Sequence, residues 1–189
     1  MKNIKSYFDH TTDWDEYNLE ISAYQKEYKR DYKGAIKDIS LAISKKPNYY
    51  YLFFERGINF FKIKKYELAI KDLSEFICMG GDKPITRRMY IEAIFLKECC
   101  EIILKIEREP LHQKFLSSTF PSKSTLGPSY MHFLIALECS TKNLFEKSLD
   151  HLQEIRDLYP DFLKNRYSYL IEHLPQEMRP ILALCWHII

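Results

Sequence analysis

The sequence predicts an all-α fold, namely an α-solenoid of about eight helices arranged as antiparallel pairs. The main observation is a repeat: Tyr32–Ser40 returns as Tyr66–Ser74, 34 residues later, with Tyr, Ala, Ile, Lys, Asp and Ser in register. A period of this length is typical of a helix–turn–helix unit that buries its apolar face against copies of itself. Two further observations agree. Apolar residues recur at the three-to-four spacing of a helical face, and the 189 residues include only five glycines, fewer than the tight turns of a sheet protein require.

The first helical pair is expected after a polar lead-in over residues 1–15. Its first helix should run from near Trp14 to Lys29, where the apolar residues follow one helical face. Its partner helix should cover Tyr32–Ser44. Pro47 then ends the unit, because proline disfavours α geometry in the residue before it.

The second pair repeats this design. A helix is expected over Tyr50–Ile63, followed by a turn at Lys64 and Lys65 and by a helix over Tyr66–Met79. Gly80 and the residues up to Pro84 should close this unit, because glycine supplies the left-handed conformation that ends many helices.

The pattern is less regular beyond residue 84. Apolar positions predict one long helix over Thr86–Arg108, with a degenerate pair as the alternative, and complete an N-terminal array over residues 16–110. The segment 111–129 is rich in Ser, Thr, Pro and Gly, which predicts a loop.

The C-terminal part, residues 130–189, is expected to contain another antiparallel pair over Tyr130–Ser140 and Leu144–Tyr159. Two more helices should follow, over Asp161–His173 and Glu177–Ile188. The last of these would cap the core or form an interface. The sequence leaves open whether these helices extend the superhelix or fold back into its groove.

Charge and composition exclude several classes of partner. The chain has 28 basic and 26 acidic residues, a balance without a general attraction to nucleic acid or anionic membranes. The sequence has no apolar segment of the length of a secretory signal or a membrane-spanning helix. Five cysteines, an odd number without framework spacing, indicate reduced thiols and therefore a cytoplasmic location.

The sequence contains none of the common catalytic and cofactor-binding motifs. The sequence contains no phosphate-binding glycine loop, no GxSxG, no HExxH and no CxxC. His132 and His151 lie on the expected antiparallel pair and could approach each other, but two ligands are a minimal basis for a metal site. Cys99 and Cys100 are expected to pack in the core. We therefore predict a protein that is not an enzyme and has no cofactor and no metal.

The repeat resembles the tetratricopeptide repeat (TPR), a helical pair with small residues where its two helices cross. In the second unit the family's characteristic positions fall on Phe53, Arg56, Gly57, Phe60, Tyr66, Ala69, Leu73, Phe76 and Pro84. In the first unit they fall on Leu19, Ala23, Tyr32, Ala35, Ile39, Ala42 and Pro47. A third, degenerate match falls on Ala136, Phe145, Ser148, Leu152, Ile155 and Pro160. The sequence departs from the pattern at Arg56 (leucine expected), Phe76 (small residue expected) and Lys26 (aromatic residue expected), which puts the local geometry there in question.

The resemblance also implies a concave groove lined by the first helix of each pair. Carried onto this chain, the groove residues are Tyr17, Glu20, Tyr24, Tyr51, Phe54, Ile58, Phe61, Tyr130, Phe133 and Leu137, with Glu27 and Ser140 at the ends of their helices. Family members that bind chaperone C-termini have lysine, arginine and asparagine at such positions. Here Glu20, Tyr24, Phe54 and Glu55 stand near them, so that carboxylate clamp is absent.

The resulting expectation is a non-catalytic module that binds a partner peptide or amphipathic helix in an apolar, aromatic groove with an acidic edge. Adaptor, chaperone and immunity roles all fit this description. In one alternative the chain's own C-terminal helices fill the groove. In others it self-assembles through its apolar C-terminal end, as a homo-oligomer, or is an enzyme with the 111–129 loop as a lid. Neither nucleic acid nor membrane is expected as a partner.

Overall fold

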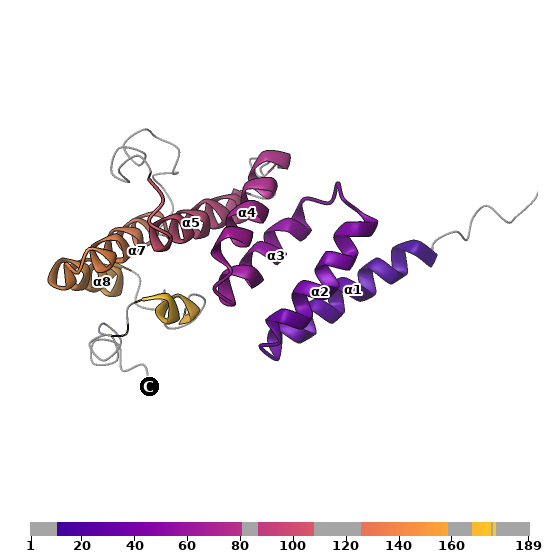
Figure 1. Ribbon diagram of the computed structural model, residues 1–189, viewed down its shortest axis with the longest axis horizontal. Helices are drawn as coiled ribbons and strands as arrows, with labels where there is room; N and C mark the ends of the chain where they lie inside the picture. Colours follow the sequence, from indigo (N-terminus) through magenta and orange to yellow (C-terminus); the bar gives the residue numbers. More distant parts are fainter. Residues whose placement is uncertain (1–10, 81–86, 108–125, 159–167, 175, 177–189) are drawn as a thin grey trace, which may run out of the picture. The chain divides into compact units, whose positions relative to one another are not determined.

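Helices and short turns account for the chain wherever its structure is described (Figure 1). The computed structural model describes residues 11–80, 87–107, 126–158, 168–174 and 176. Within these residues there are seven α-helices, one 3₁₀ helix and no strand. The predicted all-α class is therefore confirmed, and consecutive helices pack against each other as a solenoid requires.

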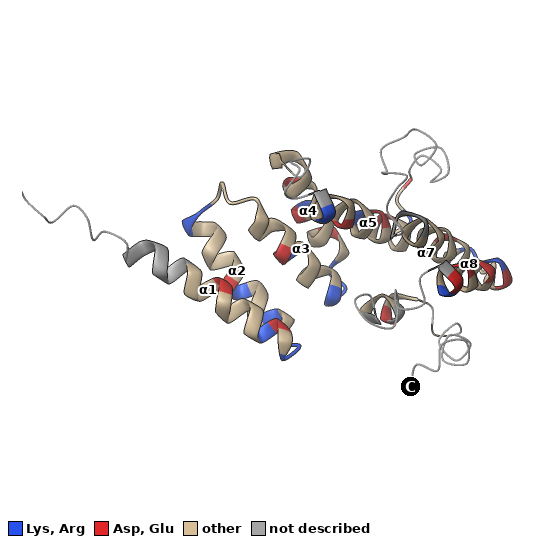
Figure 2. Cartoon of the chain, turned by 180° about the vertical axis from the view of Figure 1, so that it is seen from behind, with Lys and Arg blue, Asp and Glu red and all other residues tan. Residues whose placement is uncertain are grey.

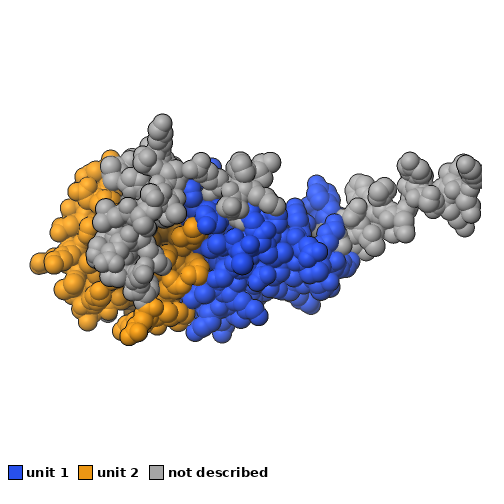
Figure 3. Space-filling model, turned by 90° about the horizontal axis from the view of Figure 1, so that it is seen from above, with its two compact units in different colours: residues 1–93 blue, residues 94–189 orange. Residues whose placement is uncertain are grey.

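The chain divides into two compact units, residues 1–93 and 94–189 (Figure 3). The division falls within helix α5 (Arg87–Ile103). The boundary predicted from the sequence, between the N-terminal array and the C-terminal part, lies later in the chain, at the loop 111–129. Most of that loop lies outside the described residues.

The first unit contains the two helical pairs predicted from the repeat. They are α1 (Thr11–Tyr28) with α2 (Tyr32–Lys45), and α3 (Tyr51–Lys62) with α4 (Tyr66–Gly80). Helix α2 also packs on α3, so that the two pairs are continuous. Helix α1 begins at Thr11, one turn before Trp14, so the predicted lead-in over residues 1–15 was too long. Helix ends of this kind are the least certain part of any sequence-based boundary.

One residue in the left-handed conformation lies in each turn between paired helices, and another follows the end of α5. These residues are Arg30, Lys64, Lys105 and Asn143, with φ between 54° and 61°. In the first turn the Asp31 amide donates to the Lys26 carbonyl oxygen and the Arg30 amide to that of Glu27, at 2.8 Å each. The other three turns have the same two bonds, which define a Schellman motif. The bonds join backbone atoms only, so the motif does not specify a side chain, and none of these four positions is a glycine.

The second pair has the close helix crossing predicted from its small residues. Gly57 and Ala69 are both buried. A Cβ atom added to Gly57 would lie 2.9 Å from Cγ of Leu73, a distance that would force the two helices apart. Glycine is therefore required here for packing rather than for its backbone freedom.

A buried aspartate recurs in each pair and explains part of the 34-residue repeat. Asp38 accepts hydrogen bonds from Ser22 Oγ at 2.6 Å and from Lys26 Nζ at 2.5 Å. Burial raises the pKa of Asp38, but these two bonds and the charges of Lys26 and Lys37 together outweigh burial, so the pKa lies below its usual value.

The equivalent residue of the second pair is Asp72, which is paired with Arg56. Arg56 Nε donates to Asp72 Oδ2 at 2.6 Å and Nη2 donates to Oδ1 at 2.9 Å. Its Nη1 atom also donates to Ser40 Oγ of α2 at 3.1 Å. The guanidinium lies between the rings of Phe53 and Phe60, 5.7 and 5.8 Å from their centroids. The arginine that departs from the tetratricopeptide pattern is thus the partner of a buried carboxylate.

The second unit is built on a hairpin of α7 (Leu126–Thr141) and α8 (Phe145–Leu158). Helix α7 begins before the predicted Tyr130, with Gly127 and Pro128 in its first turn. Proline is tolerated there because first-turn amides have no partner within the helix. The hairpin crosses at small residues, where Ser148 Oγ donates to the Ala136 carbonyl oxygen at 2.7 Å.

The core of the second unit is aromatic on one side of α7. The Phe95 ring, from α5, stacks on Tyr130 with centroids 4.3 Å apart and meets Phe133 edge-on at 5.8 Å. Cys99 and Cys100 are fully buried, which confirms their predicted core packing. Helix α5 confirms the single helix predicted over Thr86–Arg108, although it ends at Ile103.

The C-terminal helices are only partly described. Residues 168–173 form a 3₁₀ helix, η3 (Ser168–His173), at the end of the predicted helix over 161–173. The predicted helix over 177–188, and with it the proposed cap, lies outside the described residues.

Candidate functional site

Half of the predicted groove residues are buried in the two cores. Their exposed fractions are 3% or less for Phe54, Phe61, Tyr130, Phe133 and Leu137. Their assignment to an open groove is thereby corrected, because a buried side chain offers no surface to a partner. The physical reason is local aromatic packing. Phe54, for example, lies 5.0 Å from the ring of Phe76, the large residue that stands where the family pattern has a small one.

The groove residues of α1 are exposed. Tyr17 is 58% and Tyr24 72% exposed, and Glu20 is partly exposed beside them. The spacing of three to four residues places all three on one face of α1. Ile58 of α3 is half-buried and does not line either hollow described below.

These α1 residues line a hollow of about 260 Å³ together with α3. The lining from α1 is Tyr17, Glu20, Ile21, Ala23, Tyr24 and Glu27, that from α2 is Ile39, and that from α3 is Tyr51, Leu52 and Glu55. We call this the aromatic–acidic hollow. It contains three tyrosines and three glutamates, and its described lining has no lysine or arginine. Among the predicted groove residues, the structure therefore brings together Tyr17, Glu20, Tyr24 and Tyr51.

Glu55 is a lining residue that the sequence analysis did not assign to the site. It lies one helical turn after Tyr51 in α3, and that spacing is the signal that could have identified it. Burial raises the pKa of Glu55, and the nearby charges of Glu27 and Glu92 act in the same direction. A hydrogen bond from the Tyr51 hydroxyl and the charge of Lys62 oppose this shift.

The other ionisable groups of the hollow belong to the same network. Burial, with Glu55 as the main charged neighbour, raises the pKa of Tyr51, so its hydroxyl keeps its proton and donates. Glu27 is ion-paired with Lys62, whose ammonium lies 5.2 Å from the ring centroid of Tyr32. Of the three carboxylates in the hollow, Glu27 therefore already has a cationic partner, and the charge of the same lysine also acts on Glu55.

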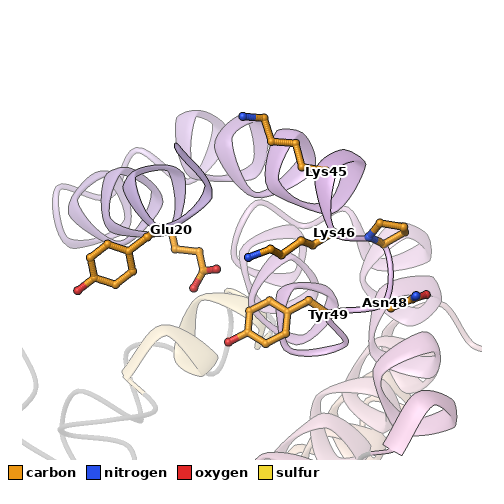
Figure 4. Close-up of a pocket in the computed structure, with 7 residues that line it drawn as sticks. Glu20, Lys45, Lys46, Asn48 and Tyr49 are labelled. Carbon is orange, nitrogen blue, oxygen red and sulfur yellow. The ribbon is translucent and has the colours of Figure 1, made fainter. Parts of the chain in front are cut away.

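A second and larger hollow of about 1060 Å³ lies beside the first and shares Tyr17 and Glu20 with it. The last residue of α2 and the connection to α3 supply the rest of its described lining, which is Lys45, Lys46, Pro47, Asn48 and Tyr49. Figure 4 shows Lys46 and Tyr49 extending toward the side occupied by Glu20, whereas Asn48 points away. Burial raises the pKa of Tyr49, and Glu20 adds to the shift. The two hollows thus meet at Tyr17 and Glu20 of α1.

The described residues show neither a cluster of three metal ligands nor a membrane-spanning helix. The described residues contain no group of three or more His, Cys, Asp or Glu placed to hold a metal ion. His132 and His151 do approach each other as the sequence analysis considered, with Nδ1 atoms 3.0 Å apart. None of the described helices combines the length and the apolar character needed to cross a membrane.

Comparison with known proteins finds no match for the chain. No protein-family model, no curated protein and no solved structure matches the chain.

Proposed function

We propose that the chain is a non-catalytic protein-interaction module of the tetratricopeptide type that binds a partner segment on the surface formed by α1 and α3. The observation that carries this proposal is the aromatic–acidic hollow, where large apolar rings and carboxylates line one concave surface. Adaptor, chaperone and immunity proteins all use such surfaces, and we do not distinguish among them. We also propose a cytoplasmic location, since the four cysteines of the described residues are free thiols.

The exposed tyrosines favour a partner over a purely structural role. Tyr17 and Tyr24 leave more than half of their surface in water, so they contribute less to the core than their size allows. Tyrosine is enriched where protein interfaces concentrate their binding energy, because it covers a large area and loses little side-chain entropy. The pair is therefore well suited to hold apolar side chains of a partner.

The carboxylates define the charge of that partner. Glu20, Glu27 and Glu55 line the hollow, and burial raises the pKa of Glu55. A lysine or arginine placed there would compensate the buried charge and would lie against tyrosine rings that also attract cations. We therefore infer a partner segment with at least one basic residue next to apolar anchors.

A selection from a random peptide library displayed on phage tests this function. The full-length chain should select peptides that combine Lys or Arg with aromatic or large aliphatic residues. Replacing Tyr17 and Tyr24 by alanine should weaken binding of the selected peptides by at least about tenfold. Tyr28→Ala is the matched control, because Tyr28 is 85% exposed on the same helix but does not line the hollow.

The charge of the site is tested separately. Glu20→Lys should reduce binding of the selected peptides, whereas Glu75→Lys, the same change at an exposed position of α4, should not. Equal binding by the parent and the double tyrosine variant would refute the site. Selection of acidic peptides would refute the charge assignment while leaving the site in place.

A further inference from the structure

Two histidines join the helices of the hairpin in the second unit. His132 of α7 and His151 of α8 are both half-buried, and their Nδ1 atoms are 3.0 Å apart. The ring centroids are 5.2 Å apart and the ring planes are inclined by 45°. The helices that carry them are joined by a Schellman turn and pack along their length. The two rings are therefore positioned by rigid elements rather than by a loop.

The contact between the rings depends on where their protons lie. When one Nδ1 carries a proton, that N–H donates to the lone pair of the other Nδ1. When both neutral rings carry their proton on Nε2 instead, two lone pairs face each other across the gap. Two lone pairs so close repel each other, and a cation bound by both nitrogens, beside the line that joins them, would turn that repulsion into two bonds.

The distance between the nitrogens is the one that a metal ion requires. Nitrogen ligands bound at about 2.0–2.1 Å lie about 2.9 Å apart at a right angle and about 3.3 Å apart at the tetrahedral angle. The 3.0 Å separation falls between these two values. The rings face each other nearly end to end, with centroids 5.2 Å apart, so both side chains would rotate to bind one ion, with little movement of either helix.

The electrostatic surroundings suit a divalent cation. Glu154 lies one turn after His151 on α8, and its negative charge acts on His132. That charge would attract a cation to the pair.

We propose that His132 and His151 form a two-histidine site for a divalent transition metal ion of the nickel, copper and zinc group. Water would complete the coordination, since no third protein ligand stands with the pair among the described residues. A site with two protein ligands exchanges its metal and should follow the general order of affinity, with copper above nickel and zinc. The bound ion would link α7 to α8 and so stabilise the hairpin.

Calorimetric titration of the untagged full-length chain with NiCl₂ at pH 7.5 tests the site. The parent should bind one equivalent, and His132→Gln and His151→Gln should each lose at least tenfold in affinity. His10→Gln, which removes an imidazole elsewhere in the sequence, should bind as the parent does. Nickel should also raise the melting temperature of the parent and of His10→Gln, but not that of the other two variants.

A second measurement does not depend on how the variants fold. In proton–nitrogen spectra of the parent imidazoles, paramagnetic Ni²⁺ should broaden the signals of His132 and His151 before those of the other four histidines. A parent chain that binds no nickel would overturn the proposal. So would full affinity in His151→Gln, or first broadening at other histidines.

Discussion

Removing the positive charge of Arg56 should strongly destabilise the first unit. Arg56→Leu introduces the residue that the tetratricopeptide pattern leads one to expect at this position. It also leaves the carboxylate of Asp72, which is 3% exposed as a residue, without its partner. The substitution therefore tests whether the ion pair or the apolar pattern dominates here.

The magnitude follows from the contacts. Breaking a buried ion pair by removing one partner costs about 3–5 kcal/mol. The lost hydrogen bond to Ser40 adds about 1 kcal/mol, and the contacts with the rings of Phe53 and Phe60 add about 0.5–1 kcal/mol. Burial of the new leucine returns about 1–2 kcal/mol. The expected net loss is about 2.5–6 kcal/mol, a large part of the stability of an ordinary domain.

Urea unfolding followed by circular dichroism measures this loss, and a double-mutant cycle isolates its cause. Replacing Arg56 and Asp72 together by leucine should return the free energy of unfolding to within about 1 kcal/mol of the parent, because no buried charge is then left unpaired. Lys26→Met is the comparison from the first pair. Lys26 is 36% exposed at its side chain and Ser22 still donates to Asp38, so this change should cost less than about 1 kcal/mol.

Two results would refute the reasoning. One is an Arg56→Leu variant within about 1 kcal/mol of the parent, which would mean that Asp72 does not need a cation. The other is a double variant as unstable as the sum of its two single variants, which would mean that the residues are not coupled.

Three further predictions concern the turns, the helix crossing and the hollow. Arg30→Gly and Lys64→Gly should each raise the free energy of unfolding by about 0.5–1 kcal/mol in urea, because both residues have positive φ; a loss in both would contradict the strain argument. Gly57→Val should lower the melting temperature and cost about 1–3 kcal/mol, because its side chain meets Leu73. Glu55→Gln should stabilise the chain at pH 7, since a carboxylate whose folded pKa is raised loses stability as pH rises through that pKa. This gain should vanish below pH 4.5, the ordinary pKa of a glutamate, and a gain independent of pH would show that the charge is not its cause.

The repeat made the helices predictable because it is a local property of the chain. The spacing of apolar residues gives the pairs α1–α2 and α3–α4, and the small side chain of Gly57 gives the close crossing. The recurrence of Asp38 and Asp72 was also visible in the sequence. Its meaning was not, because their partners lie sixteen residues earlier, at Ser22 and Arg56, and become neighbours only when the helices pair.

The exposure of groove residues could not be predicted in the same way. Tyr24 and Phe54 were both assigned to the groove from their positions in the repeat, yet one is 72% and the other 3% exposed. The difference comes from Phe76, which fills the space beside Phe54. Which residues line a hollow therefore depends on the volume of side chains from other helices, a quantity that periodicity does not contain.

The Schellman turns have an electrical consequence. Arg30 and Lys64 end α1 and α3, where the carbonyl groups of a helix leave a partial negative charge, and a cation near that end is favourable. Figure 2 shows basic residues at these turns and acidic residues along the helices between them. A charged solute that approaches the first unit is therefore oriented by this electrostatic field before it contacts any side chain. Where the field attracts the solute, the association rate should decrease as added salt screens the field.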